Sequence, residues 1–330
     1  MTIGTEARHS DTAVEVSGLT VSFVMGDRPV EVLSDVSFSL RRNRITGLVG
    51  ESGSGKSVTA LAIMDLLPQE AEVAVDRVRI GDDVFESIDR STVGARRGNE
   101  LSMIFQEPIR SLNPAFRAGD QIAAVVRRHK RVSGREARHR ATELLELVGI
   151  PDPARTAAAF PHQLSGGMSQ RVMIALALAG EPNVLFADEP TTALDATTQA
   201  QVLALLKELA DRLGMTTLIA THDLGVVAEL CDDVIVMYAG EIVEMATVEE
   251  VFARPRHPYT RALLSCSRLD DGALRGIPGS VPQPGKWPRG CRFAPRCEIA
   301  VEGACTAEPL PLRRIGTRST RCRRAEEMDL

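Results

Sequence analysis

The sequence predicts an α/β fold in which strands of a central sheet end in loops that carry polar side chains. Three apolar runs support this prediction, and each leads directly into such a loop: Ile45–Val49 precedes a glycine-rich stretch, Val184–Ala187 precedes Asp188 and Glu189, and Thr216–Ala220 precedes His222. In open α/β sheets, ligands bind at the carboxyl ends of the strands. The three loops are therefore expected to meet in one site.

Composition limits the classes of protein that fit. The chain has 330 residues, 44% of them hydrophobic and 25% charged, which is ordinary for a globular protein of one large domain or two smaller ones. A net charge of -5 argues against a general nucleic-acid binder. The longest apolar stretch, 172–180, is about half of what a bilayer requires. The first thirteen residues lack an apolar signal-peptide core, so we expect a mature cytosolic N-terminus.

The glycine-rich stretch after the first strand matches the pattern G-x-x-x-x-G-K-[ST]. We call it the phosphate loop, and its residues are Gly50, Glu51, Ser52, Gly53, Ser54, Gly55, Lys56 and Ser57. Glycines let the backbone N–H groups point at phosphate oxygens, and the helix predicted to follow, through Met64, adds its positive end. Lys56 would neutralise β- and γ-phosphates and the Ser57 hydroxyl would bind Mg²⁺. A glycine-rich turn without a ligand is the alternative.

The other two strands end in groups suited to hydrolysis. Asp188 can hold Mg²⁺ and Glu189 can polarise an attacking water. His222 could contact the γ-phosphate and align the water with Glu189, although a surface histidine after a strand is the simpler interpretation when it stands alone. These residue types in this order predict a nucleoside triphosphatase.

Helical spacing accounts for much of the remaining chain. Apolar residues repeat at helical spacing in 141–150, in 172–179 and in 202–213, and Gly149 and Gly180 are plausible helix stops. A basic run at 127–131 is expected to be a solvated helix face rather than a contact for acidic partners or lipid.

A second anion site precedes the helix over 172–179. Ser165, Gly166 and Gly167 place a hydroxyl and free N–H groups at that helix's N-terminus. One nucleotide does not need two such sites on one chain. We therefore expect the second site to face the nucleotide of another subunit.

Together these residues resemble the nucleotide-binding subunit of an ABC transporter. The resemblance depends on motifs in the family's order: the phosphate loop, Gln106 in MIFQEP, the signature LSGGM at 164–168, Asp188 with Glu189, the loop ending at Asp195, and His222. Phe23 occupies the adenine-stacking position, with a core strand residue as the alternative. Met168 departs from the glutamine of many ABC proteins. The chain resembles the ATPases of oligopeptide, dipeptide and nickel importers in this methionine and in three further stretches, FQEPIRSLNPAF, DEPTTALDATTQAQ and HPYTRALL.

The resemblance implies the architecture. It implies a P-loop NTPase of ABC type, with a RecA-like core, an antiparallel β subdomain and a helical subdomain. It also implies the boundaries: a tail over 1–12, the nucleotide-binding domain over 13–265 with its helical subdomain at about 107–180, and a C-terminal extension over 266–330.

The resemblance also implies the function and the partners. Two ATPase chains, paralogues or two copies of this one, would close around two ATPs, each held by one chain's phosphate loop and by Ser165, Gly166, Gly167 and Met168 of the other. Mg²⁺ would be held through Ser57, Gln106 and Asp188. Glu189 and His222 would promote hydrolysis, and Gln106 with the segment 111–114 would transmit closure to two transmembrane permease subunits. The expected setting is the cytoplasmic face of the inner membrane, bound peripherally, with an extracytoplasmic solute-binding protein and no nucleic acid.

The transported solute is open at this point. Peptide is the default, with nickel, metal–chelator complexes or glutathione as alternatives. A soluble ABC ATPase acting on nucleic acid or ribosomes is the competing class, and the acidic balance and the HPYTRALL stretch favour the importer.

The tail contains four cysteines after a proline- and glycine-rich linker at 274–290. Cys291, Cys297, Cys305 and Cys322 are irregularly spaced, which suits an iron–sulfur cluster better than a zinc knuckle built from C-x₂₋₄-C pairs. Disulfides do not suit a cytosolic ATPase. From Lys286 the tail has ten basic and six acidic residues, which would offset an anionic cluster or face acidic lipid. Cys231 and Cys266 are isolated and are interpreted as small apolar residues.

Resemblance supports the cluster as well. Peptide importer ATPases carry GCxFxxRC in this region, matched by Gly290, Cys291, Phe293, Arg296 and Cys297. This implies a 4Fe–4S cluster in preference to zinc or to no metal. We expect it to fasten the tail rather than to take part in ATP chemistry.

Overall fold

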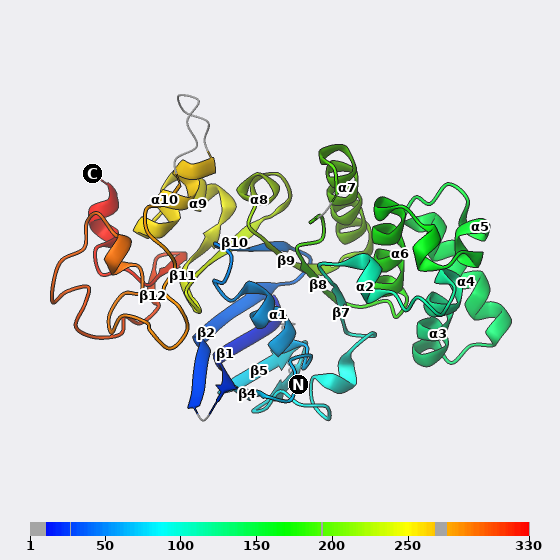
Figure 1. Cartoon of the computed structure of the whole chain (residues 1–330), viewed down its shortest axis with the longest axis horizontal. Helices are drawn as coiled ribbons and strands as arrows, with labels where there is room; N and C mark the ends of the chain where they lie inside the picture. Colours follow the sequence, from blue (N-terminus) through cyan, green and yellow to red (C-terminus); the bar gives the residue numbers. More distant parts are fainter. Residues whose placement is uncertain (1–10, 27, 193, 268–275, 330) are drawn as a thin grey trace, which may run out of the picture.

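The computed structural model describes residues 11–329 except 27, 193 and 268–275. Most of the expected tail over 1–12 therefore lies outside the described residues. Figure 1 shows a main sheet across the middle of the molecule, a second sheet below it, and helices at both ends.

The main sheet has eight strands within the described residues, in the order β12-β13-β11-β10-β3-β9-β8-β7. Five of them are parallel: β10 (Asp233–Tyr238), β3 (Ile45–Val49), β9 (Thr216–Thr221), β8 (Val184–Asp188) and β7 (Leu101–Ile104). The side chains of β3, β7, β8 and β9 are buried throughout, as expected for strands covered on both faces. The three strands expected from the apolar runs are confirmed as β3, β8 and β9.

The second sheet is antiparallel. Its strands are β1 (Thr12–Met25), β2 (Arg28–Arg41), β4 (Ala71–Ala74), β5 (Arg77–Ile80) and β6 (Asp83–Phe85). Helix α1 (Lys56–Ile63) follows the phosphate loop, and its residues Ala60, Ala62 and Ile63 belong to a buried cluster with side chains of both sheets. This packing holds the loop and the first turn of α1 at the junction of the two sheets.

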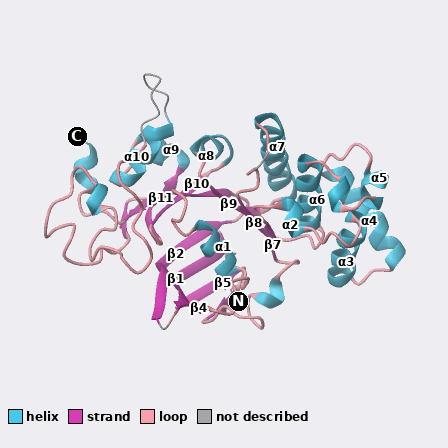
Figure 2. Cartoon of the chain, viewed as in Figure 1, coloured by secondary structure: helices cyan, strands magenta, loops and turns pink. Residues whose placement is uncertain are grey.

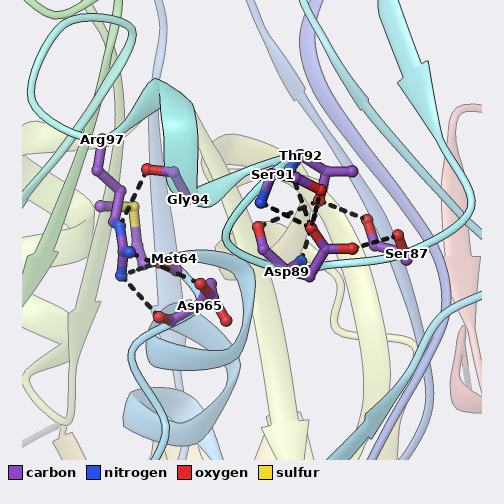
Figure 3. Close-up of polar contacts among 8 residues, drawn as sticks. All are labelled: Met64, Asp65, Ser87, Asp89, Ser91, Thr92, Gly94 and Arg97. Carbon is purple, nitrogen blue, oxygen red and sulfur yellow. Dashed lines mark hydrogen bonds and ion pairs between the residues drawn. The ribbon is translucent and has the colours of Figure 1, made fainter.

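The end of α1 is fastened to the loop that follows β6, which contains the 3₁₀ turn Gly94–Arg96 (Figure 3). Arg97 donates to the main-chain oxygens of Asp65 (2.7 Å) and Met64 (3.3 Å). In the same loop, Asp89 accepts hydrogen bonds from Ser87 and Ser91, which lower the pKa of its carboxyl group. The C-terminal end of the phosphate-loop helix is therefore anchored by hydrogen bonds from Arg97.

A group of helices forms the right-hand end of the molecule in Figures 1 and 2. It contains α2 (Pro108–Ser111), α3 (Ala118–Lys130), α4 (Gly134–Leu147), α5 (Pro153–Ala158), the 3₁₀ turn Pro161–Gln163 and α6 (Gly166–Leu178). Helix α7 (Ala196–Leu213) packs beside α6, and buried residues of both belong to one core with α3 and α4. The helices expected from apolar spacing are confirmed as α4, α6 and α7. In the basic run, Arg127 and Arg128 are exposed.

The C-terminal segments complete the opposite end of the main sheet. After α8 (Leu224–Leu230) come β11 (Glu241–Thr247), α9 (Val248–Ala253), α10 (Pro258–Ser267), the turns Ala294–Arg296 and Ala325–Asp329, and the short strands β12 (Arg313–Ile315) and β13 (Arg318–Thr320). Strand β13 pairs with β11, and Phe293 shares a core with Tyr238 and Tyr259. The described linker residues 276–290 contain no helix or strand. Within the described residues, no helix is both long and apolar enough to span a membrane.

Candidate functional site

The phosphate loop curls around its own lysine. Lys56 Nζ donates to the main-chain oxygens of Gly50 (2.8 Å) and Glu51 (3.2 Å). Glycine is required at Gly55, where φ is +108° and a Cβ would lie 2.5 Å from Leu33 Cδ2. Burial lowers the pKa of Lys56, and the carboxylates of Glu189 and Asp188 oppose that effect. The ammonium group is thus held in the loop, close to two acidic groups.

Ser57 and Asp188, both expected to hold Mg²⁺, lie next to each other. Ser57 Oγ donates to Asp188 Oδ1 at 2.9 Å, which joins the start of α1 to the end of β8. Asp188 is buried, and burial raises the pKa of its carboxyl group even though the Ser57 hydrogen bond opposes this. A hydroxyl and a carboxylate are oxygen ligands of the kind that Mg²⁺ prefers.

Three side chains hold the carboxylate of Glu189. Gln106 Nε2 donates to Oε2 at 3.1 Å, Thr192 Oγ1 donates to the same oxygen at 2.8 Å, and His222 Nδ1 lies 3.2 Å from Oε1. Burial raises the pKa of Glu189, but the hydrogen bonds from Thr192 and His222 outweigh it and hold the pKa below its usual value. The structure therefore brings Gln106, Glu189 and His222 together. Thr192 was missed in the sequence analysis, where it was only part of a quoted motif.

The signature residues lie at the start of α6, where Ser165 and Gly166 are exposed and Gly167 and Met168 are partly buried. Ser165 caps the helix by accepting a hydrogen bond from the Met168 N–H (3.3 Å), and Gly166 and Gly167 form its first turn. A Cβ on Gly167 would lie 2.8 Å from Thr198 Cγ2, and Thr198 N–H donates to Asp195 Oδ1 at 2.9 Å. The loop ending at Asp195 and the signature are therefore neighbours. Figure 1 shows α6 among the right-hand helices, apart from α1.

Phe23 lies on β1, opposite Val30 of β2 and Ala71 of β4. Its side chain is partly buried and packs against the core between the sheets. The side chain is thus only partly covered, and the stacking role remains a prediction.

The phosphate loop also contacts the C-terminal extension. Arg296 forms a two-point ion pair with Glu51, at 2.8 Å from Nη1 to Oε2 and 3.1 Å from Nη2 to Oε1. The Glu51 N–H donates to the Tyr259 hydroxyl at 2.8 Å. In the sequence, Arg296 and Tyr259 stand out only as members of the motifs GCRFAPRC and HPYTRALL. The structure joins two regions that the sequence treated separately.

The four tail cysteines line one small cavity of about 20 Å³, together with His257, Phe293 and Arg324. Burial raises the pKa of Cys291 to about 12 and of Cys322 to about 11. Across the described residues, no group of three or more histidine, cysteine, aspartate or glutamate side chains is arranged to hold a metal ion. The thiols thus share a cavity without forming a metal-binding arrangement. Cys231 packs against the hydrophobic core, as expected of an apolar residue.

Two family models match the chain. The ABC transporter model matches residues 33–192, and the model of the oligopeptide/dipeptide transporter C-terminal region matches residues 243–305. Among curated proteins, the chain is 46% identical over 320 residues to the oligopeptide transport ATP-binding protein AppD of Bacillus subtilis (strain 168), covering 96% of this chain and 98% of AppD.

Solved structures share the fold. The ATP-binding cassette MJ0796, a dimer in a post-hydrolysis state bound to ADP and Pi, matches with a TM-score of 0.63 and 31% identity over 71% of this chain and 98% of that one. The protein cbiO1 from Clostridium perfringens, part of the cbiONQ transporter complex, matches with a TM-score of 0.60 and 28% identity over 74% of this chain and 92% of that one. The chain therefore belongs to the ATP-binding proteins of the ABC transporter family, and it carries the C-terminal region of the oligopeptide/dipeptide transporters.

Proposed function

We propose that the chain is the ATP-binding and hydrolysing subunit that energises an ABC importer for peptides. The observation that carries the proposal is the arrangement around Glu189, which is held by Gln106, Thr192 and His222 beside the Ser57–Asp188 pair. The name of AppD and the family match over 243–305 support peptide as the solute.

The chain's own residues account for the chemistry. Lys56 would exchange its two main-chain partners for β- and γ-phosphate oxygens of ATP. Ser57 and Asp188, with Gln106, would hold Mg²⁺, which would supply positive charge to neutralise the phosphates. Glu189 is ionised at neutral pH, as an ordinary glutamate is, and its lowered pKa keeps it ionised in slightly acidic solution as well. The carboxylate can therefore accept a hydrogen bond from the attacking water and orient it. His222 fixes the Glu189 carboxylate and approaches the γ-phosphate.

Hydrolysis requires a second ATPase subunit, either a paralogue or another copy of this chain. Ser165 and Gly166 are exposed at the N-terminus of α6, whose partial positive charge suits a phosphate group. Because this helix stands apart from α1, the signature is free to cover the nucleotide bound by the partner's phosphate loop. Closure of the pair would sandwich two ATPs.

The permease contact is proposed at the segment that follows Gln106. Ile109 and Phe116 are each 56% exposed in this segment, and they flank the residues 111–114. Apolar side chains exposed beside a residue that touches Glu189 can pass closure on to a transmembrane subunit. The proposed complex also contains two permease subunits and an extracytoplasmic solute-binding protein. The chain would lie peripherally at the cytoplasmic face of the inner membrane.

Purification of the complex from membranes tests the function. We expect hydrophobic permease subunits to copurify, and ATPase activity in proteoliposomes to rise with a peptide-loaded binding protein. Stimulation by nickel, a metal chelate or glutathione in place of peptide would reassign the solute. ATPase activity stimulated by nucleic acid or ribosomes, without a membrane partner, would contradict the importer.

We propose further that the four tail cysteines hold an iron–sulfur cluster. Four sulfur donors from separate loops face one cavity, and Arg324 beside them suits an anionic group. A cavity of about 20 Å³ has room for about one water molecule, so a cluster requires these loops to spread, whereas a single zinc ion does not.

Anaerobic purification with metal analysis distinguishes the occupants of the four-cysteine cavity. A brown protein absorbing at about 400 nm, with the absorbance lost in Cys297→Ser, is expected for a cluster. A colourless protein that contains only zinc would show that the four cysteines bind zinc and not a cluster. A protein without metal would contradict a metal site at these cysteines.

A further inference from the structure

The C-terminal extension reaches the phosphate loop at Glu51. We propose that Arg296 and Tyr259 are positioning residues that set the ATP affinity of this loop, and that they couple the four-cysteine cavity to nucleotide binding. The inference rests on the proposed ATP site and adds a regulatory connection to it.

The Arg296 side chain is buried and fixed by several hydrogen bonds. Its side chain is 5% exposed, and besides Glu51 it donates to the main-chain oxygens of Pro278 (2.7 Å) and Ile277 (3.0 Å) and to the Tyr238 hydroxyl (3.2 Å). A planar guanidinium with this many fixed partners holds a carboxylate in one orientation.

The Arg296 contact has an electrostatic consequence. Glu51 is the second residue of the phosphate loop, and its main-chain oxygen already accepts a hydrogen bond from Lys56. An unpaired carboxylate at this position would oppose the binding of triphosphate, since like charges close together in a partly buried site repel strongly. Arg296 neutralises that charge.

Tyr259 fixes the backbone at the same residue. Its hydroxyl accepts the Glu51 N–H, and its ring is fully buried, with centroids 4.6 Å from Tyr238 and 5.4 Å from Phe293. The direction of the first N–H group of the loop after Gly50 is therefore set by a residue of α10. A rigid aromatic cluster holds that residue in turn.

Arg296 and Tyr259 are both connected to residues that line the four-cysteine cavity. Arg296 directly precedes Cys297 in the chain. The Tyr259 N–H donates to His257 Nδ1 at 3.1 Å, so the other ring nitrogen of His257 carries the hydrogen, and that nitrogen lies 4.0 Å from Cys291 Sγ. Phe293 lines the cavity and packs on Tyr259. A change in the arrangement of the thiols therefore moves both groups that hold Glu51.

Nucleotide binding by Arg296 variants tests the first part of the inference. ATP affinity is measured by calorimetry on the full chain in the Glu189→Gln background. Arg296→Met should weaken ATP binding about tenfold, within the usual range for coupled sites, and Arg296→Lys should weaken it less. Adding Glu51→Gln to Arg296→Met should restore most of the affinity, because it removes the unpaired charge. A purely structural role for Arg296 would not produce this rescue.

The matched control is Arg318→Met, which removes an arginine from the same extension that pairs with Glu250 instead. It should leave ATP affinity unchanged. Wild-type affinity in Arg296→Met, Arg296→Lys and Tyr259→Phe would overturn the inference while leaving the ATP site intact. Failure of the parent chain to bind ATP would overturn the proposed function as well.

The second test uses the reciprocity of coupling between two sites. If the four-cysteine cavity affects ATP binding, ATP binding must also affect the four-cysteine cavity. Alkylation of Cys291 and Cys297 by iodoacetamide is followed by mass spectrometry on the full chain after removal of any bound metal, with and without ATP. A small free thiol in the same solution serves as the reference for reagent reactivity. We expect ATP to change the rates at Cys291 and Cys297 severalfold, and the change to disappear in Arg296→Met. Equal rates with and without ATP would contradict the coupling.

Discussion

Glu189 occupies a backbone conformation that a glutamate seldom adopts, with φ of +44°. The left-handed region costs a residue with a side chain about 1–2 kcal/mol. Three side chains compensate by holding its carboxylate, while its N–H donates to the Ala220 oxygen at 2.9 Å. The turn brings the carboxylate close enough to Lys56 for the two charges to interact, which is the position that the proposed role in hydrolysis requires.

Glu189→Gln tests the role of this carboxylate. The amide keeps the shape but cannot act as a base, so the ATPase rate should fall by a factor of about a hundred or more, while ATP binding remains. Steady-state phosphate release and nucleotide affinity are the measurements. An unchanged rate would remove Glu189 from the chemistry.

Thr192→Val should change the pH dependence of hydrolysis. The active form of Glu189 is the carboxylate, so activity is lost as pH falls through its pKa. The Thr192 hydrogen bond lowers that pKa, and its removal should move the acid limb of the pH–rate profile to higher pH. Thr192→Ser keeps the hydroxyl and is the control. An acid limb at the same pH in the valine variant would contradict this assignment.

At this scale the sequence predicted the charged groups and two of the three side chains that hold Glu189, namely Gln106 and His222. It missed Thr192 and the contact of Arg296 with the phosphate loop. Lys56, Asp188 and Glu189 follow recognisable spacing after buried strands. Thr192 and Arg296 act through distances that depend on how loops fold back, and Arg296 lies 245 positions from its partner Glu51. Spacing in the sequence carries no information on such a contact.

Among the elements, α6 combines two tasks at its N-terminus. Ser165 caps the helix and is also expected to contact the partner's nucleotide. Ser165→Ala should therefore cost about 1 kcal/mol of stability and also abolish ATP-dependent dimerisation. The matched control is Ser133→Ala, which removes the equivalent cap of α4, where Ser133 accepts from Glu136 N–H. Light scattering with ATP in the Glu189→Gln background measures dimerisation separately from the loss of stability. Dimerisation by Ser165→Ala would contradict the signature role.

The short helix α2 supports a separate prediction about the permease. Ile109→Asp should leave the ATPase rate of the isolated chain unchanged but reduce peptide uptake by the complex severalfold, because a charge there would have to be desolvated on docking. Val301→Asp, at a side chain that is 44% exposed in the extension, is the control. Uptake equal to wild type in Ile109→Asp would place the permease contact elsewhere.

The elements differ in how well the sequence predicts them. The parallel strands β3, β8 and β9 were predicted because they are continuous apolar runs, and amphipathic helices such as α7 were predicted because their helical periodicity is strong. Strands β12 and β13 were missed, since each has three residues and contains arginine. Their pairing arises from tertiary packing, which outweighs local preference at such lengths.

For the whole molecule, Arg321 joins the extension to both sheets. Its side chain is 6% exposed and donates to the main-chain oxygens of Leu310 (2.7 Å), Ile242 (3.0 Å) and Asp35 (3.4 Å). Arg321→Met leaves these acceptors without a donor, so the free energy of unfolding should fall by about 3 kcal/mol. Urea denaturation measures it. The exposed Arg314→Met should change stability by less than about 0.5 kcal/mol. Equal stabilities for the two variants would contradict this account.

The strand order of the main sheet has a consequence for how the protein behaves at high concentration. Without the extension, the seven residues of β11 would form the sheet's edge and offer open backbone groups to another chain. Strand β13 covers part of that edge, and β12, which is short and contains Arg313 and Arg314, becomes the new border. Short charged borders resist edge-to-edge aggregation. We therefore expect the extension to lower the tendency of this chain to aggregate through the edge of its main sheet.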